Sequence, residues 1–432
     1  MSTAKTETIP TVDHKQHAAF FRQSGWLMIA TIGGGLMTFG VHFLAKSNSV
    51  PKSQYAAFGT LLMVVACLPT MPLQMIFAQQ SALTLATGRE RQLAGMIRLI
   101  WLWTFIVWLL GVVPVFAFQK QIVAGWHLPD ATGLWVTLLL LLFSLWVPLF
   151  SGVLQGRQDF FWLGWSSILG GVGRFAGAVF LVLALSLGSA GMMAGALMGV
   201  GLSAVVAIWR TRDLWSLAVE RFDGKNLLRQ VLPLVFGFGA CQFMFTSDTM
   251  FAKAYFSDDE IAPYVAAGTL SRALLWLVMP LAAVMFPKIV HAAAKSEKTN
   301  LFNLVVLGTA VLAICGGLGL WLVGPLVIKL VFKSTYLSAA TLIPWYAGAM
   351  VPLAMANVMV NDLLARSRFG VVPWMVLLAV AYGFTLPVML NHFPGRLEVV
   401  LQTLGAFNLL LFLICAWFTW GVKAKTKMDD GK

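Results

Sequence analysis

The chain carries a series of long apolar stretches that are almost free of charged residues. Twelve of them are long enough to cross a hydrocarbon core of roughly 30 Å. Their approximate limits are 25–45, 56–80, 96–118, 134–154, 161–186, 190–208, 231–254, 264–286, 302–323, 339–362, 371–391 and 399–420. Because lipid cannot satisfy backbone hydrogen bonds, stretches of this length must form helices. The sequence therefore predicts an all-α integral membrane protein with about twelve spans.

Composition and cysteine placement agree with a membrane location. Hydrophobic residues make up 59% of the chain and charged residues 11%, whereas soluble domains carry about 25% charged residues. The four cysteines fall inside apolar stretches without metal-ligand spacing, so we expect no metal site and no disulfide framework.

The distribution of Lys and Arg among alternate loops predicts the orientation. One set of loops, which includes both terminal tails, holds 21 of these residues, and the other set holds 7. This bias predicts that both termini lie in the cytoplasm. The longest internal connection divides the spans into two blocks of six, as in many secondary transporters. The expected organisation is a cytoplasmic tail (1–23), a six-helix bundle (24–208), a basic cytoplasmic linker (209–230), a second six-helix bundle (231–420) and a second tail (421–432).

Arg174 is the most unusual residue within the predicted spans. It lies in the middle of residues 160–187, where burial costs about 2.5–3.5 kcal/mol on insertion scales. At helical spacing, small residues share its face, so a neighbouring helix or cargo can come close. The members of this face are Ser167, Gly170, Gly171, Gly177 and Ala178. Two interpretations remain open: Arg174 binds an anionic cargo, or it forms a structural ion pair with Asp248.

Other polar residues at depth are further candidates for the cavity. Arg272 lies in the eighth stretch, and His42 shares a predicted helix face with Thr31, Gly35 and Thr38 in the first. His42 is either a cavity residue or a hydrogen-bonded packing residue. A second polar face in the seventh stretch comprises Gln242, Thr246, Thr249 and Lys253.

Four acidic or basic residues at other positions have different expected roles. Asp248 lies roughly 120° away from the polar face of the seventh stretch, which suits pairing with another helix or ion coupling. Arg98, Asp362 and Arg366 lie near predicted cytoplasmic ends. They are expected to act as interface anchors or as salt bridges of a cytoplasmic gate.

Several motifs are absent from the sequence. There is no GxxxxGK[ST], HExxH, CxxC or GxSxG pattern. We therefore expect no enzyme activity, no catalytic residue and no cofactor. Buried carboxylates are scarce while arginines are present at depth, and guanidinium groups bind phosphate well. This balance favours an anionic cargo over a cationic one.

Two segments resemble polysaccharide-exporting flippases of the multidrug/oligosaccharidyl-lipid/polysaccharide (MOP) exporter superfamily. Residues 149–208 carry the family's LQG turn, mid-helix arginine and following glycines. Residues 247–290 carry its Asp, tyrosine-alanine start, arginine and closing FP. The matching positions are Leu154, Gln155, Gly156, Arg174, Gly188, Gly191, Asp248, Tyr264, Ala266, Arg272, Phe286 and Pro287. A third, weaker match covers residues 328–347.

The resemblance implies two six-helix bundles around a central basic cavity, with a fold like that of MATE exporters, in the bacterial inner membrane. It implies alternating access and an undecaprenyl-pyrophosphate-linked oligosaccharide as cargo, during O-antigen or exopolysaccharide synthesis. Arg174 and Arg272 are the positions carried over as cavity residues. The chain lacks the extra helix pair of fourteen-span flippases, which argues against a peptidoglycan-precursor flippase.

Expected partners and alternative functions can also be stated from the sequence and the resemblance. We expect membrane lipid, a polysaccharide polymerase and other export components as partners, no nucleic acid, and a monomer. The first rival is a cation-coupled multidrug or metabolite exporter of the same fold. The others are a glycan polymerase, which the short outer loops disfavour, and a membrane subunit of a secretion assembly.

Overall fold

The computed structural model describes residues 14–220, 224–275, 301–366 and 368–421, and within these ranges the chain forms helices and no strands. The predicted all-α membrane fold is therefore confirmed. Eleven helical segments in the described ranges are long and apolar enough to cross a membrane. The eighth predicted span, 264–286, is described to residue 275 and is helical from residue 258. Residues 1–13 and 422–432 of the expected tails lie outside the described residues.

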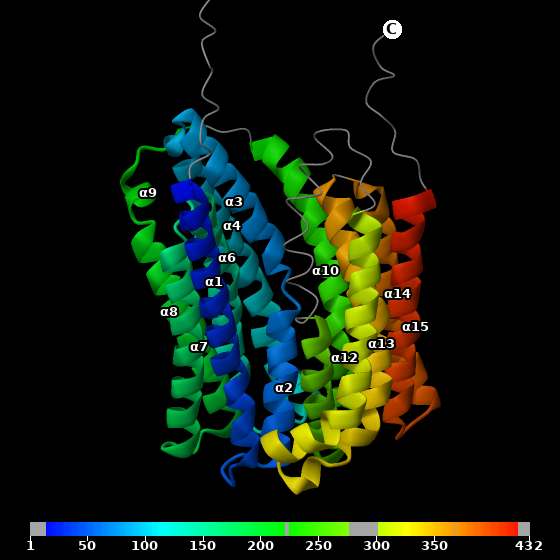
Figure 1. Cartoon of the computed structure of the whole chain (residues 1–432). Coiled ribbons are helices and arrows are strands. Elements are labelled where there is room, and N and C mark those ends of the chain that lie inside the picture. The colour runs from blue at the N-terminus through cyan, green and yellow to red at the C-terminus, as the bar shows by residue number, and fades with distance from the viewer. Residues whose placement is uncertain (1–13, 221–223, 276–300, 367, 422–432) are drawn as a thin grey trace, which may run out of the picture.

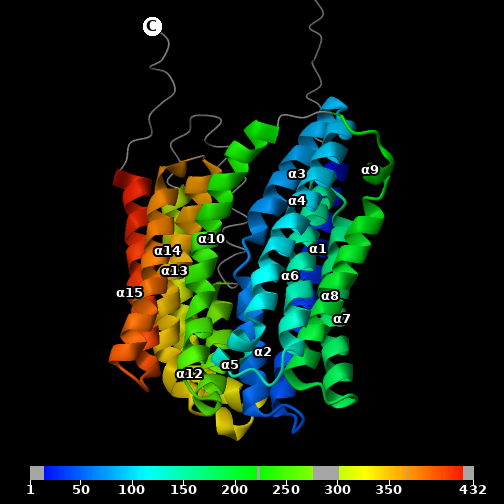
Figure 2. The same cartoon turned by 180° about the vertical axis from the view of Figure 1, so that it is seen from behind.

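Figures 1 and 2 show the helices in two groups that stand side by side. The first group consists of α1 (His14–Gly40), the 3-10 turn η1 (Val41–Lys46), α2 (Lys52–Ala66), α3 (Thr70–Thr87), α4 (Glu90–Ala117), α5 (Gln119–Gly125), α6 (Thr132–Gly156), α7 (Phe160–Leu183), α8 (Gly188–Arg210) and the short α9 (Asp213–Ser216). Because α1 begins at His14, the end of the expected tail continues the first helix.

The second group starts with α10 (Gly224–Tyr255) and ends close to the C-terminus. It also contains the helix over residues 258–275, α12 (Leu301–Val331), η2 (Ser334–Tyr336), α13 (Ala339–Ala365), η3 (Phe369–Val371), α14 (Val372–His392), α15 (Leu397–Ala416) and the π turn η4 (Trp417–Gly421). The start of α1 and the end of α15 lie at the same end of the molecule (Figure 1). We call this end the terminal side and the other end the far side.

The second predicted span is broken into two helices at a proline. Helix α2 ends at Ala66, and α3 begins at Thr70 after Pro69. The Thr70 backbone N–H bonds to Leu68 O at 2.9 Å instead of continuing the helical ladder, so the Ala66 carbonyl has no helical partner. The Gln242 side chain of α10 donates to this carbonyl at 2.8 Å. The break thus supplies a polar contact between the two groups inside the membrane.

The small residues of α7 allow close packing with two neighbouring helices. A Cβ atom at Gly171 would lie 2.3 Å from the Gly34 carbonyl oxygen of α1. A Cβ atom at Gly170 would lie 2.4 Å from Ser203 Oγ of α8, and one at Gly195 would lie 2.5 Å from the Ala178 backbone nitrogen. Small residues at such contacts are typical of membrane helix pairs. This part of the small-residue face is therefore filled by helices.

Replacement of Gly171 by valine should destabilise the first group. The new side chain would overlap the α1 backbone, and overpacking of this kind costs about 1–3 kcal/mol. We expect a lower melting temperature and less monodisperse protein in detergent, measured by fluorescence-detected gel filtration after heating. Gly111→Val on α4 is the matched control, because a Cβ at Gly111 meets no atom within 4 Å. Equal stability of the two variants would contradict the proposed packing.

Candidate functional site

Arg174 lies where α7 contacts α8, and no described residue forms an ion pair with it. A Cβ atom at Gly199 of α8 would lie 2.7 Å from the Arg174 Cβ. At 1.5 Å per residue, Arg174 is about 21 Å from the start of α7 and about 14 Å from its end. Among the described residues its guanidinium makes no hydrogen bond or salt bridge, and its Nε is buried without a partner. The side chain as a whole is partly exposed. It is therefore an uncompensated cation inside the membrane.

His42 lies near the part of α7 that carries Arg174, because a Cβ atom at Gly40 would lie 2.9 Å from the ring of Phe175. It belongs to η1 and not to α1, so the expected helix face with Thr31, Gly35 and Thr38 ends before His42. The ring is 5% exposed, and its Nδ1 lies 2.8 Å from the Tyr55 hydroxyl. His42 thus has the environment of a hydrogen-bonded packing residue next to the Arg174 site.

Arg272 has a different environment, because it is paired inside the second group. Its Nη2 donates to Asp248 Oδ1 at 2.6 Å and to Thr249 Oγ1 at 2.9 Å. Its Nε donates to the Phe245 carbonyl at 3.1 Å, and its guanidinium lies 5.2 Å from the Tyr346 ring centroid. Asp248 therefore pairs with Arg272 and is not the partner of Arg174. Its expected role as a cavity residue stays a prediction, and in this conformation its guanidinium is engaged by Asp248.

Two tyrosines complete the hydrogen bonding of Asp248. The Tyr264 hydroxyl donates to Asp248 Oδ2 at 2.7 Å, and the Tyr346 hydroxyl donates to the same oxygen. Asp248 and both tyrosines are fully buried. A buried ion pair is stable when its remaining lone pairs are satisfied in this way. A Cβ atom at Gly268 would lie 2.7 Å from Arg272 Nη1, so the glycine leaves space for the guanidinium. We call Asp248, Thr249, Tyr264, Arg272 and Tyr346 the buried network.

The polar face expected on α10 is engaged with protein groups. Gln242 bonds to Ala66 of α2, and Thr246 Oγ1 donates to the Gln242 carbonyl at 2.7 Å. The Lys253 side chain is fully buried and pairs with Asp258. Gln242, Thr249 and Lys253 thus contact neighbouring helices, whereas Thr246 bonds within α10. The expected role of Lys253 as a cavity residue stays a prediction, and in this conformation its charge is paired with Asp258.

The three residues expected at a cytoplasmic gate do not connect the two groups. Arg98 Nη2 donates to the carbonyls of Leu217, at 2.8 Å, and Trp215, and so fastens the linker to α4. Arg366 Nε donates to Asp362 Oδ1 at 2.8 Å within one helix, α13. Both expected roles, as gate salt bridges or as interface anchors, stay predictions.

Within the described residues, the side-chain polar contacts between the two groups lie at the α2–α3 break or on the far side. Lys333 donates to the Ser47 carbonyl at 3.0 Å and to Asn48 Oδ1 at 3.1 Å. Lys52 Nζ lies 3.0 Å from Asp259 Oδ1. On the terminal side, by contrast, apolar residues of α10, including Leu227, pack against α3 and α4. The far side of the group interface is thus the polar one.

A cluster of aromatic residues closes the far side, and the sequence interpretation did not identify it. The Tyr55 ring centroid lies 5.5 Å from that of Phe332 and 5.7 Å from that of Tyr336. Burial raises the pKa of Tyr336, so its hydroxyl stays neutral. Five of the six tyrosines are fully buried, which includes Tyr264 and Tyr346 of the buried network. No spacing or motif in the sequence links Tyr55, Phe332 and Tyr336 as one cluster.

Comparisons of sequence and of structure give different results. No protein-family model matches the chain, and no curated protein matches it. Three solved structures share its fold over most of its length. A multidrug resistance MATE family transporter of the MOP superfamily, inward-facing, has a TM-score of 0.72 at 11% identity and covers 92% of this chain and 96% of its own.

The lipid II flippase MurJ, in an inward closed conformation, has a TM-score of 0.68 at 12% identity, covering 93% of this chain and 88% of its own. A MOP superfamily transporter from Pyrococcus furiosus has a TM-score of 0.63 at 13% identity, covering 93% of this chain and 94% of its own. Its description reports a binding pocket of reverse polarity and suggests a different function. These neighbours are transporters and a flippase, not enzymes. The chain is a multi-pass membrane protein with the MOP superfamily transporter fold.

Removal of the Asp248 charge should destabilise the second group. Asp248→Asn leaves the Arg272 guanidinium buried without a counter-charge, which costs about 3–5 kcal/mol. We expect a marked loss of thermal stability in detergent, and partial recovery in the double variant Asp248→Asn/Arg272→Met. Arg396→Gln, at an exposed arginine before α15, is the control. A double variant less stable than Asp248→Asn alone would contradict the charge-pairing account.

Proposed function

We propose that the protein flips an undecaprenyl-pyrophosphate-linked oligosaccharide across the bacterial inner membrane during synthesis of O-antigen or exopolysaccharide. The observation that carries this proposal is that Arg174 has no acidic partner among the described residues, whereas Asp248 and Arg272, the other charges deep in the spans, pair with each other. A chain does not keep such a cation at depth without a use, because its burial costs several kcal/mol. Pyrophosphate is an anion that a guanidinium binds through two hydrogen bonds.

Three features support this choice of cargo. Arg174 as a residue is partly exposed, although its Nε is buried. The carboxylate of Asp248, which a cationic cargo or ion would need, accepts bonds from Arg272, Tyr264 and Tyr346. A lipid-linked cargo is also compatible with the fold, since one structural neighbour is a lipid II flippase. The oligosaccharide would cross with its lipid tail in the bilayer.

Alternating access of the two helix groups is part of the proposal. We assign residues 24–208 and 231–420 to the two moving bundles, joined by the linker over residues 209–230, with both termini in the cytoplasm. The polar contacts and the aromatic cluster on the far side would then form the outer gate, closed in this conformation. The multidrug transporter and the flippase described above were both captured in inward conformations, which supports this assignment. A polysaccharide polymerase and other export components would act beside it.

A cation-coupled multidrug exporter is the second candidate, because a MATE family transporter is among the structural neighbours. It would have to use Asp248, and that use requires the Arg272 pair to open. Cells that express the protein should then survive cationic dyes better than cells that express Asp248→Asn. Equal survival would favour the flippase.

Arg174→Ala should abolish flipping while the protein still folds and inserts. The variant lacks the only guanidinium of α7, and the helix contacts made by the neighbouring glycines remain. The measurement is surface polysaccharide in a strain that depends on the chain, with membrane abundance measured in parallel. Arg174→Lys, which keeps the charge but not the planar fork, should retain part of the activity. Arg396→Gln is the control, and normal surface polysaccharide in Arg174→Ala would overturn the assignment.

Gly59→Leu should hold the outer gate open. A Cβ atom at Gly59 of α2 would lie 2.2 Å from Val265 Cγ1 in the second group, so a leucine separates the groups there. We expect faster hydrogen–deuterium exchange at Lys333–Tyr336 and loss of flipping. Gly348→Leu on α13 is the control, since a Cβ there meets no atom within 4 Å. Unchanged exchange at η2 would show that the far-side contacts are not a gate.

A further inference from the structure

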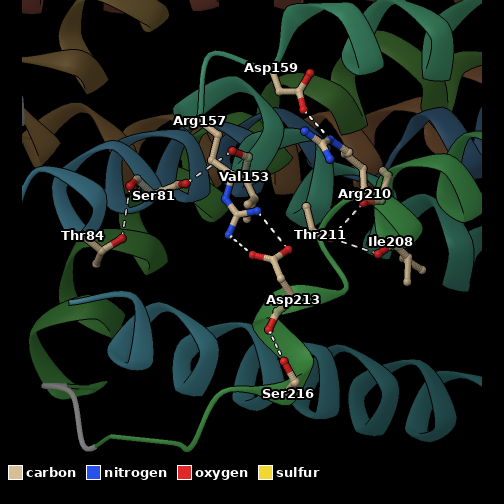
Figure 3. A network of polar contacts seen from close by, with 11 residues as sticks. Ser81, Thr84, Val153, Arg157, Asp159, Ile208, Arg210, Thr211, Asp213 and Ser216 are labelled. Carbon is tan, nitrogen blue, oxygen red and sulfur yellow. Dashed lines mark hydrogen bonds and ion pairs between the residues drawn. The ribbon is translucent and has the colours of Figure 1, made fainter. Parts of the chain in front are cut away.

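A second charged site lies at the terminal-side ends of α6 and α8 and the start of α7. It is a pocket of about 660 Å³, within the usual size range of ligand pockets. Its lining residues are Arg157, Gln158, Asp159, Trp209, Arg210, Arg212 and Asp213. Figure 3 shows the two ion pairs of this pocket, between Arg157 and Asp213 and between Arg210 and Asp159. Arg174 is about 21 Å along α7 from this end, so the two sites are distinct.

Two of the three arginines in the pocket form ion pairs with its two aspartates, and the third has no carboxylate partner among the described residues. Arg157 binds Asp213 through two bonds of 2.6 and 3.1 Å, and Arg210 Nε lies 2.7 Å from Asp159 Oδ2. The Arg157 guanidinium holds the pKa of Asp213 below its usual value, so this pair stays ionised at neutral pH. Arg212 is exposed and has no acidic partner among the described residues. Its guanidinium lies 5.4 Å from the Trp209 ring centroid.

The surroundings of the pocket are those of the membrane–water interface. Its residues flank the ends of three membrane-spanning helices, and the Trp209 and Trp162 rings pack edge to face at 5.2 Å. Tryptophan is enriched at this depth. Below the pocket, α8 exposes an apolar strip at spacings of three and four residues, formed by Leu202, Val205 and Trp209. An acyl chain could lie along this strip while a phosphate occupies the pocket.

We propose that this pocket binds the headgroup phosphate of an anionic phospholipid. Arg212, oriented by its stack on Trp209, would donate to the phosphate, and Arg157 and Arg210 would add positive potential that Asp213 and Asp159 partly offset. The stacked guanidinium is held in place before binding, which lowers the entropic cost of binding. The apolar strip on α8 favours a lipid over free phosphate, because free phosphate makes no use of it. Bound lipid would fasten the start of the linker to the first group.

The test is native mass spectrometry of the purified full chain with short-chain lipids. Dioctanoyl phosphatidylglycerol is titrated with and without excess inorganic phosphate, and dioctanoyl phosphatidylcholine serves as the zwitterionic comparison. We expect preferential binding of phosphatidylglycerol, weakened about tenfold or more in Arg212→Gln. Arg212→Lys should bind with intermediate affinity. Arg229→Gln, at an exposed arginine of α10 outside the pocket, is the matched control and should bind like the parent protein.

Three results would overturn the proposal. Equal loss of affinity in Arg212→Gln and Arg229→Gln would mean that general charge attracts the lipid. Equal binding of the two lipids would mean that the acyl chains alone are recognised. Displacement of phosphatidylglycerol by inorganic phosphate at an equal concentration would mean that the pocket is a site for free phosphate. The flipping assay is independent of these outcomes, so they do not bear on the role of Arg174.

Discussion

The free-energy cost of placing a charged side chain in hydrocarbon is the constraint on which the packing of this structure depends. In the second helix group the cost is met by pairing, because Arg272 binds Asp248 and two buried tyrosines satisfy the rest of the carboxylate. The ion pair joins α10 to the helix over residues 258–275, and the hydrogen bond from Tyr346 adds α13. These contacts therefore help to fix how the three helices pack. Removal of one partner would leave the other as an uncompensated buried charge.

The buried charge of the first group, Arg174, has a different environment. Arg174 is surrounded by glycines that bring α1 and α8 close to α7, and no acidic residue in the described part of the chain approaches its guanidinium. The glycines permit tight helix contacts while the arginine keeps its charge. A rigid support around an unneutralised cation suits a site that receives its counter-charge from a ligand.

The interface between the groups is asymmetric, and this asymmetry is compatible with the proposed alternation of the two groups. The far side uses polar contacts that can be broken in the presence of water, such as those of Lys333 and Lys52. The terminal side uses apolar contacts made by the start of α10. The α2–α3 break at Pro69 lies between them and gives Gln242 its acceptor. A broken helix at such a point is a frequent feature of transporters, because its free backbone groups can exchange partners.

The sequence by itself determined the class of the protein, because apolar length and backbone hydrogen bonding leave a lipid-embedded chain few alternatives. It also singled out Arg174, Arg272 and Asp248, since charges at depth are rare enough to stand out. It did not determine which charges meet. Asp248 lies opposite Arg272 and not Arg174 because of how α10 packs against the next helix, and Lys253 is neutralised by Asp258 across a turn. His42 does not lie on the predicted helix face, because α1 ends before it and a 3-10 turn begins at Val41. The pairing of charges depends on the rotation and contact of neighbouring helices, which are properties of tertiary packing and not of any one span.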